Sequence, residues 1–444
     1  MNRNYFKFLC LVLSLTLWSC STADKAPKED LHPSTDLHQS IKALMDVHVY
    51  DITSPPLASR SMVYPILAAQ YAFAAANANE DVIAKQLNGW GQQTPPPPSL
   101  SKEESEWAAL AAFLQTGEQH VYSLDKWKQW TDSLETKYRA QLTPEAYDAG
   151  WQWGSLCAKQ MEAYAQADGL ADIRTRAKYQ VGPVSKGMWV PTPPNYMDPI
   201  EPHWGDLRPF TLDSGAQFAP EPPTPFDMTE GSAFHAEARE VYEIVNNLTE
   251  EQRQIAAFWD CNPYVVLHKG HFMQPVKKIT PGGHWMGITR IACQKADLSF
   301  GESLQTYAYV AVALADGFIS CWDEKYRSRY IRPETVINTF WDSKWMPTLQ
   351  TPPFPEYTSG HSVISTAAAR ALTHLLGDDF SYVDDVELEF GLPTREYPSF
   401  LAASEEAAVS RIYGGIHFRP AVEDGVQQGH QVADQVLQTI TIHE

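Results

Sequence analysis

The stretch "FPEYTSGHS" at 354–362 places Ser359, Gly360 and His361 directly before an apolar run. That run, "VISTAAARALTHLL", predicts a buried helix that begins within this stretch. A helix start has backbone N–H groups without partners and a partial positive charge, so it suits an oxyanion. A serine hydroxyl, a glycine N–H and an imidazole at this position therefore indicate an oxyanion site with an acid–base group beside it.

Two further clusters of basic residues lie in the last third of the chain. "KYRSRYIRP" contains Lys325 and, seven residues later, Arg332 followed by Pro333. A residue before proline is disfavoured in helical geometry, which predicts that Arg332 joins a long helix to a new one. "SRIYGGIHFRP" contains Arg411 and His417 on either side of a double glycine that predicts a helix end. Each cluster alone is a weak signal, because basic residues near helix ends are commonly solvated.

Taken together, the clusters suit a tetrahedral oxyanion. Lys325, Arg332 and Arg411 supply three positive charges, enough to offset a phosphate or a vanadate. Each arginine can donate two hydrogen bonds in a fork. His417 would meet the central atom of the oxyanion along one axis.

The order of these clusters resembles the signature of a known superfamily. Lys-x6-Arg-Pro, Ser-Gly-His and Ser-Arg-x5-His, over residues 325–417, are similar to the motifs that unite type 2 phosphatidic acid phosphatases, class A bacterial acid phosphatases and vanadium haloperoxidases. "PPFPEYTSGHS", "CWDEKY" before Lys325 and "SRIYGGIHFRP" resemble the haloperoxidase versions. The bacterial vanadium iodoperoxidases are the most similar, in chain length and in Thr358, where many relatives have proline.

The resemblance implies a vanadate cofactor with His417 as the axial ligand of vanadium. The residues expected to hold vanadate are Lys325, Arg332, Ser359, Gly360, Arg411 and His417. In such an enzyme Lys325 polarises hydrogen peroxide, His361 transfers protons, and vanadium acts as a Lewis acid without changing oxidation state. The implied reaction oxidises a halide to hypohalous acid. Iodide is the expected halide because it is the easiest to oxidise, with bromide as the alternative.

Two aromatic residues are expected on the side from which halide approaches. Phe354 lies five residues before Ser359, and Trp322 lies three residues before Lys325, one helical turn away. Plain core packing is the alternative for both, because aromatic side chains near helix ends are commonly buried.

One detail departs from the superfamily pattern, which continues His-x3-Asp where this chain has Ala421. A histidine that binds a metal needs a partner for its other ring nitrogen. Asp424, Glu423 or a backbone carbonyl is expected to be that partner for His417, and the sequence does not choose among them.

Two other functions would use the same residues. An acid phosphatase or lipid pyrophosphate phosphatase would use His417 as its nucleophile. Lipid phosphatases of this group have several membrane-spanning helices, whereas no charge-free apolar run of about 20 residues is present in the chain after its N-terminal segment. A lipoprotein that binds an oxyanion without turnover is the other alternative.

Helical spacing of apolar residues dominates the chain and predicts an all-α fold. We expect two helical bundles packed together, with the active site in the C-terminal bundle. The expected helical patterns occupy 61–87, 123–142, 146–169, 232–248, 249–260, 301–326 and 421–440. We expect one domain, 36–444, made of an N-terminal half (36–180), a proline-rich connection (181–230) and a catalytic half (231–444).

The first 20 residues, "MNRNYFKFLCLVLSLTLWSC", have the pattern of an export signal. Their apolar stretch is too short to span a membrane, so we expect cleavage after residue 19. "LWSC" resembles a bacterial lipobox, so Cys20 is expected to carry a lipid, followed by a flexible tether over 20–35. An ordinary cleaved signal is the alternative. We expect a periplasmic or cell-envelope lipoprotein that contacts the membrane only through this anchor.

Composition excludes some partners. The net charge of -20 argues against nucleic acid. The remaining cysteines contain no C-x-x-C pair, which argues against a zinc site. These cysteines could form disulfide bonds or remain as buried free thiols, and the sequence does not choose between the two. The protein is expected to be a monomer. These cysteines are Cys157, Cys261, Cys293 and Cys321.

Overall fold

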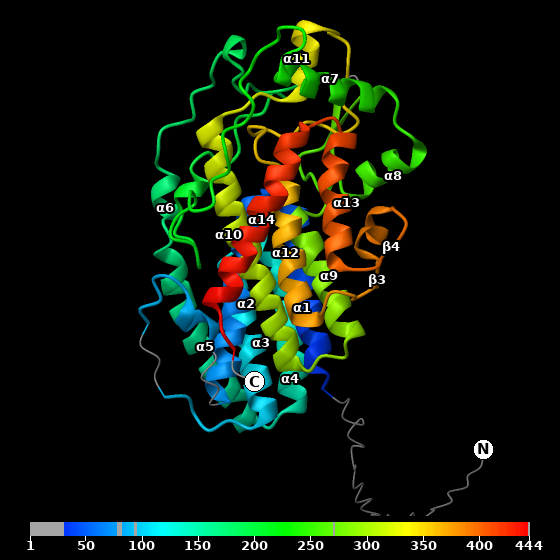
Figure 1. Ribbon diagram of the computed structural model, residues 1–444. Helices are drawn as coiled ribbons and strands as arrows, with labels where there is room; N and C mark the ends of the chain where they lie inside the picture. Colours follow the sequence, from blue (N-terminus) through cyan, green and yellow to red (C-terminus); the bar gives the residue numbers. More distant parts are fainter. Residues whose placement is uncertain (1–30, 78–81, 93–95, 270, 443–444) are drawn as a thin grey trace, which may run out of the picture. The chain divides into compact units, whose positions relative to one another are not determined.

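The computed structural model describes residues 31–77, 82–92, 96–269 and 271–442. Within these ranges the chain forms fourteen α-helices and two small hairpins, so the predicted all-α class is confirmed (Figure 1). The predicted export signal (1–19) and Cys20 lie outside the described residues. Helix α1 begins at Pro33, so the last three residues of the predicted tether are helical.

The N-terminal half is a bundle in which α2, α3 and α5 pack against one another, and α1 and α4 pack beside them. Sequence signals set the ends of these helices: Ser101 and Glu104 form a capping box on α3, and the Thr143 hydroxyl caps α5. The helices are α1 (Pro33–Asp51), α2 (Pro55–Ala76), α3 (Lys102–Glu118), α4 (Leu124–Gln141), α5 (Pro144–Gln166) and the short α6 (Leu170–Ile173). A 3-10 turn, η1 (Ile83–Gln86), follows α2.

The C-terminal half is a second bundle, in which α10, α12 and α14 lie side by side (Figure 1). Helix α10 also packs against α2 and so joins the two bundles, as expected for a long apolar helix buried along most of its length. The helices are α7 (Ala233–Asn246), α8 (Glu250–Phe258), α9 (Pro281–Lys295), α10 (Phe300–Ser328), α11 (Pro333–Phe340), α12 (Gly360–Leu376), α13 (Phe400–Tyr413) and α14 (Arg419–Thr439).

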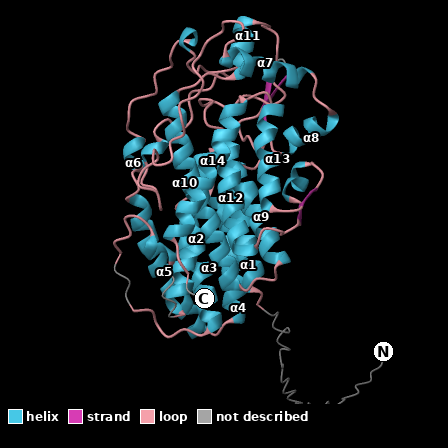
Figure 2. Cartoon of the chain, in the orientation of Figure 1, coloured by secondary structure: helices cyan, strands magenta, loops and turns pink. Residues whose placement is uncertain are grey.

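The segment expected to be a proline-rich connection contains only two 3-10 turns, η2 (Val184–Lys186) and η3 (Trp204–Asp206). It is fixed to α10 by the buried carboxylate of Asp316, which accepts hydrogen bonds from Phe210 N at 2.7 Å and Thr211 N at 2.8 Å. Figure 2 shows that loops gather at the end of the helices where α7 and α11 lie. The domain boundaries themselves stay a prediction.

The two hairpins are antiparallel. Strand β1 (Val266–Lys269) pairs with β2 (Phe272–Pro275), and β3 (Tyr382–Asp384) pairs with β4 (Arg395–Tyr397). A 3-10 turn, η4 (Val386–Phe390), follows β3 directly. The β3–η4 corner contacts α9 and brings two buried acidic residues, Asp384 and Glu387, against that helix.

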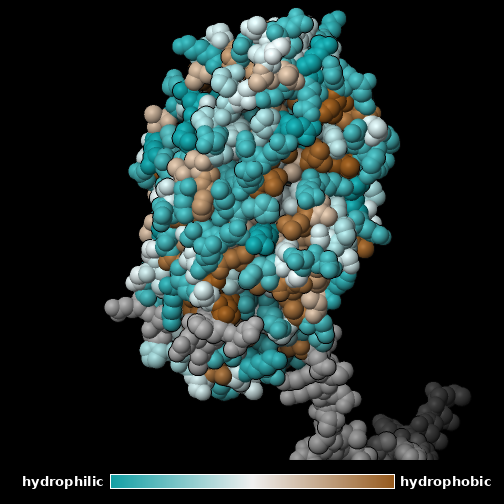
Figure 3. All heavy atoms as spheres, in the orientation of Figure 1, coloured by the Kyte–Doolittle hydropathy of each residue, from teal (hydrophilic) through white to brown (hydrophobic). Residues whose placement is uncertain are grey.

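The surface drawn in Figure 3 is mainly hydrophilic, with apolar residues in small groups. Among the helices of the described ranges, none combines the length and apolar character that a bilayer crossing requires. The four cysteines named above are all buried and form no disulfide bond, so of the two expected states they adopt that of free thiols.

Candidate active site

The residues expected to bind an oxyanion meet where α12 begins. Ser359 is the N-cap of α12, and its hydroxyl oxygen accepts a hydrogen bond from Ser362 N at 3.3 Å. The Ser359 N–H donates to Ala421 O at 2.9 Å, which fixes this helix start against the first turn of α14. Gly360 and His361 are the first two residues of α12. The predicted helix start is therefore confirmed.

Arg332 joins three segments at the same place. It is the N-cap of α11, with extended backbone before Pro333, as the sequence predicted. Its guanidinium is fully buried and donates from Nε to Phe354 O at 3.0 Å and from Nη1 to Ile416 O at 2.7 Å. Nη1 also lies 3.1 Å from His417 Nε2. The remaining nitrogen, Nη2, is buried without a hydrogen-bond partner.

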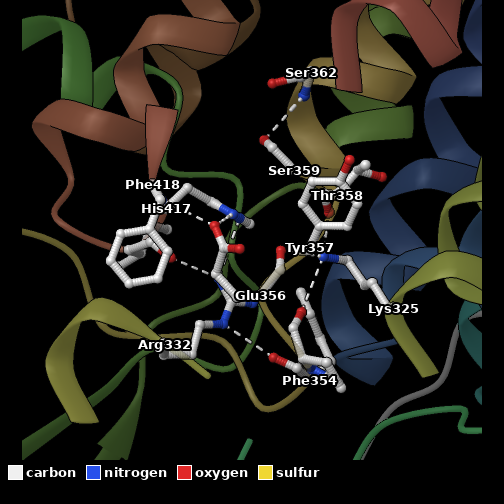
Figure 4. A network of polar contacts seen from close by, with 12 residues as sticks. Lys325, Arg332, Phe354, Glu356, Tyr357, Thr358, Ser359, Ser362, His417 and Phe418 are labelled. Carbon is white, nitrogen blue, oxygen red and sulfur yellow. Dashed lines mark hydrogen bonds and ion pairs between the residues drawn. The ribbon is translucent and has the colours of Figure 1, made fainter. Parts of the chain in front are cut away.

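Lys325 is fully buried in the last turn of α10, behind the loop that precedes α12. Its Nζ donates to the carbonyl oxygens of Pro355 and Glu356, both at 3.0 Å, and to that of Thr358 (Figure 4). Burial lowers the pKa of the Lys325 ammonium to about 8. All three N–H groups of the Lys325 ammonium donate to backbone carbonyls of loop 355–358, so Lys325 fixes the conformation of this loop.

Arg411 lies near the C-terminal end of α13, where Gly414 caps the helix. Its Nη1 donates to Trp259 O at 2.6 Å, while its Nε is buried without a partner. Burial lowers the pKa values of Lys325, Arg332 and Arg411, and the nearby acids that oppose this include Glu356 for the first two and Asp260 for Arg411. Three cationic groups are thus buried close together, and an anionic ligand would offset part of the cost of their desolvation.

His417 follows the turn that ends α13, in which Gly415 has a φ of 73°, a conformation that favours glycine. Its Nδ1 lies 2.8 Å from Glu356 Oε1, and Phe418 N donates to the same oxygen at 2.9 Å (Figure 4). Arg332 can only donate, so His417 Nε2 accepts, and Nδ1 carries the proton and donates a hydrogen bond to Glu356. The tautomer leaves the Nε2 lone pair as the one available to a metal.

This contact corrects the prediction for the partner of His417. The side chain of Asp424 accepts from the Tyr357 hydroxyl at 2.8 Å, and Glu423 lies toward Arg419 on the same helix. Glu356 lies inside the stretch "FPEYTSGHS", but nothing in the sequence connects it to a histidine 61 residues later. The one available signal was the presence of an acidic residue in the motif, between Pro355 and Ser359.

The charges of this pair follow from burial. Burial raises the pKa of the Glu356 carboxyl to about 8, against the opposing effect of Arg332, and its Oε2 has no hydrogen-bond partner. Burial, followed by the positive charges of Arg332 and Lys325, holds the pKa of His417 well below its usual value. His417 is therefore neutral, as a metal ligand must be.

His361, at the start of α12, lines the same pocket as His417 and Arg411. Its Nε2 is buried and has no hydrogen-bond partner. Burial, followed by the positive charge of Arg411, holds the pKa of His361 well below its usual value. A neutral imidazole with a free ring nitrogen can take up a proton from a bound substrate.

A small pocket opens onto these groups and is lined by Gly360, His361, Arg411 and His417. Both predicted aromatics, Trp322 and Phe354, also line it, with ring centroids 4.9 Å apart. Lys325, Arg332 and Ser359 do not belong to the lining and lie behind it. The structure thus brings all nine predicted site residues to one region, in two layers.

The residues of this region fit a tetrahedral oxyanion such as vanadate. Two arginine nitrogens in this region are buried without a hydrogen-bond partner, Arg332 Nη2 and Arg411 Nε. Buried groups of this kind are rarely left unsatisfied, and an oxyanion beside Nε2 of His417 would accept from both arginines. The donor set is therefore complementary to a small, multiply charged anion.

Comparison with known proteins agrees with this geometry. A family model described as the VCPO second helical-bundle domain matches residues 305–443. No curated protein matches the chain. Two solved structures of a bacterial vanadium-dependent chloroperoxidase, in holo and apo forms, share the fold with 16% identity, TM-scores of 0.66 and 0.64, and coverage of 87% of this chain and 93% and 95% of theirs.

A third solved structure is much more similar. The crystal structure of the first bacterial vanadium-dependent iodoperoxidase is 44% identical, with a TM-score of 0.86, over 94% of this chain and 99% of that one. Identity of this extent includes both bundles and the connection between them. The chain therefore belongs to the vanadium-dependent haloperoxidases.

Proposed function

We propose that this protein uses vanadate to catalyse the oxidation of iodide by hydrogen peroxide to hypoiodous acid, with bromide as a slower substrate. The observation that carries the proposal is the neutral His417, whose Nε2 lies 3.1 Å from Nη1 of the buried Arg332 and which lines one pocket with Arg411. Each of these arginines also has a buried nitrogen without a partner. The similar iodoperoxidase structure supports iodide as the halide. When bound, vanadate supplies a Lewis acid that activates hydrogen peroxide.

The chain's own residues would divide the binding of vanadate between them. His417 donates its Nε2 lone pair, and Glu356 keeps the imidazole in the required tautomer through Nδ1. Arg332 and Arg411 donate to the oxygens and offset their charge. The Gly360 N–H and the Ser359 hydroxyl lie at the positive end of α12 and add hydrogen bonds.

His361 is the proposed acid–base residue. Its neutral Nε2 can accept a proton as hydrogen peroxide enters and return it as the oxygen–oxygen bond breaks. One further proton from solvent completes the balance, in which hydrogen peroxide, halide and a proton give water and hypohalous acid. We infer that Lys325 acts as a positioning residue, because its ammonium holds the three carbonyls of loop 355–358 and places Glu356 and Ser359.

The proposal is tested with vanadate-free protein. Iodide oxidation should appear on titration with vanadate, reach its limit near one vanadate per chain, and decrease when phosphate competes for the same site. The His417→Ala variant is the control and should stay inactive at equal vanadate. Activity that depends on haem or iron, or phosphomonoester hydrolysis by the vanadate-free protein without any iodide oxidation, would contradict the proposal.

We also propose that the protein is exported as a monomer with a lipid on Cys20. Support comes from the export-signal pattern and the lipobox-like "LWSC" of the sequence. A Cys20→Ser variant should pass from the detergent phase to the aqueous phase on detergent partitioning. Wild-type protein found wholly in the aqueous phase would exclude the anchor.

A further inference from the structure

We propose that Cys261, His284 and Glu387 form a zinc-binding site next to the oxyanion pocket. All three side chains are buried, and their ligand atoms lie within 4.8 Å of one another. Cys261 Sγ is 3.5 Å from His284 Nδ1, Nδ1 is 3.1 Å from Glu387 Oε1, and Sγ is 3.7 Å from the same oxygen.

The three ligands come from separate parts of the fold. Cys261 follows α8, His284 lies in the first turn of α9, and Glu387 belongs to η4. The cysteine is 23 residues from the histidine and 126 residues from the glutamate. Ligands so far apart in the chain have no C-x-x-C spacing, so the absence of that spacing does not exclude zinc here.

The triangle of ligand atoms has the size of one face of a zinc tetrahedron. Zinc bonds of about 2.3 Å to sulfur and about 2.0–2.1 Å to nitrogen and oxygen give edges of roughly 3.4–3.6 Å between ligands at tetrahedral angles. The three observed edges lie within about 0.3 Å of that range. A zinc ion would need little movement of the side chains to bind.

The histidine is also held in the orientation that a metal requires. His284 Nε2 lies 2.8 Å from Asp384 Oδ2, while the other oxygen of Asp384 accepts from Val386 N at 3.0 Å. Nε2–H therefore donates a hydrogen bond to Asp384, and Nδ1 points toward Cys261 and Glu387, where its lone pair would bind a metal in place of a proton. A carboxylate behind the histidine is the usual outer partner of a zinc ligand.

Without a cation, three electron-rich atoms converge in a fully buried space. The Nδ1 lone pair would face a carboxylate oxygen at 3.1 Å, which is repulsive unless a proton lies between them. Thiolate, imidazole and carboxylate together favour zinc over calcium or magnesium, which prefer oxygen ligands. Zinc would displace the thiol proton to solvent.

The position of this site connects it to Arg411 in the oxyanion pocket. Cys261 lines the pocket that contains His361 and Arg411. Two residues earlier, the carbonyl of Trp259 accepts the hydrogen bond of Arg411 Nη1, and the Trp259 ring stacks on His284 at 4.7 Å. A zinc ion bound here would fix segment 259–261 against α9 and so fix the position of Arg411.

Elemental analysis and cobalt substitution test the proposal on the intact protein. We expect about one zinc per chain after dialysis against a weak chelator. After zinc is replaced with cobalt, the wild-type protein should show a thiolate-to-cobalt charge-transfer band in the near ultraviolet. Cys261→Ser should lose this band, whereas Cys293→Ser, which changes another buried thiol outside the cluster, should retain it.

Two results would overturn the site. If the wild-type protein binds neither zinc nor cobalt, a shared proton and not a metal holds the three side chains together. This measurement uses the wild-type protein alone and does not depend on the folding of a variant. A folded Cys261→Ser protein that keeps the charge-transfer band would remove Cys261 as a ligand. Zinc content is measured without vanadate, halide or peroxide, so its outcome is independent of the proposed reaction.

Discussion

Glu356 Oε1 accepts a hydrogen bond from Nδ1–H of His417 at 2.8 Å, and both side chains are buried. The contact connects the loop before α12 to the loop before α14. It leaves the lone pair of His417 on Nε2, which faces Nη1 of Arg332, a group that can only donate. The pair thus determines the tautomer and the orientation of the proposed vanadium ligand.

Two substitutions of Glu356 should distinguish the contribution of its hydrogen bond to vanadate affinity from the contribution of its charge. At pH below about 8 the carboxyl is largely protonated, so Glu356→Gln, which keeps an oxygen for Nδ1, should change vanadate affinity less than about threefold. Glu356→Ala removes the partner of His417 and should weaken vanadate binding by roughly 10–100-fold. A vanadate titration of both variants measures this. Equal losses in the two variants would show that charge, and not tautomer control, is the function of Glu356.

Anion binding should weaken as pH rises through about 8. An anion favours protonated Lys325, whose pKa is lowered to about 8 by burial, and so affinity decreases when that proton is lost at higher pH. Deprotonation of Glu356 at about the same pH acts in the same direction.

Sulfate is the suitable probe for this effect because its own charge does not change between pH 6 and 10. Calorimetric affinity should be constant below about pH 7 and fall by at most tenfold per pH unit for each proton lost. In the Glu356→Gln variant, sulfate affinity should decrease with pH only by the amount that deprotonation of Lys325 causes. Affinity that is constant across the range would contradict the lowered pKa of Lys325.

The two histidines should differ in what their loss removes. His417→Ala deletes the proposed bond to vanadium and should abolish tight vanadate binding. His361→Ala should retain vanadate and lose turnover by roughly 10²–10⁴-fold, as expected for an acid–base residue. Equilibrium dialysis with vanadate beside steady-state iodide oxidation distinguishes the two roles. Equal loss of vanadate by both variants would refute the assignment.

The aromatic wall should affect the choice of halide. Trp322 and Phe354 line the pocket, and an apolar wall disfavours small, strongly hydrated anions more than iodide because entry removes water. Phe354→His and Trp322→Arg should therefore change the iodide-to-bromide ratio of kcat/KM more than they change vanadate affinity. Kinetics with both halides checks this. Unchanged ratios in folded variants would assign both rings to core packing alone.

Several local features could be predicted because short-range contacts determine them. The Ser359 N-cap depends on a residue three positions away, and so does the capping box of Thr249 and Gln252. Arg332 is extended because of the ring of Pro333, and α13 ends at a double glycine. The order of the basic clusters likewise depended only on residue types and spacing, which was enough to indicate the chemistry.

Other features depended on which helices pack together. The partner of His417 is Glu356 and not an acid of α14, because the start of that helix is bonded through Ala421 O to Ser359, which brings the preceding loop against His417. The ammonium of Lys325 faces loop carbonyls because α10 ends beneath that loop. Cys261 and Glu387 meet across 126 residues of chain. No periodicity in the sequence encodes such contacts, since burial in the tertiary structure both creates them and shifts the pKa values of the groups that form them.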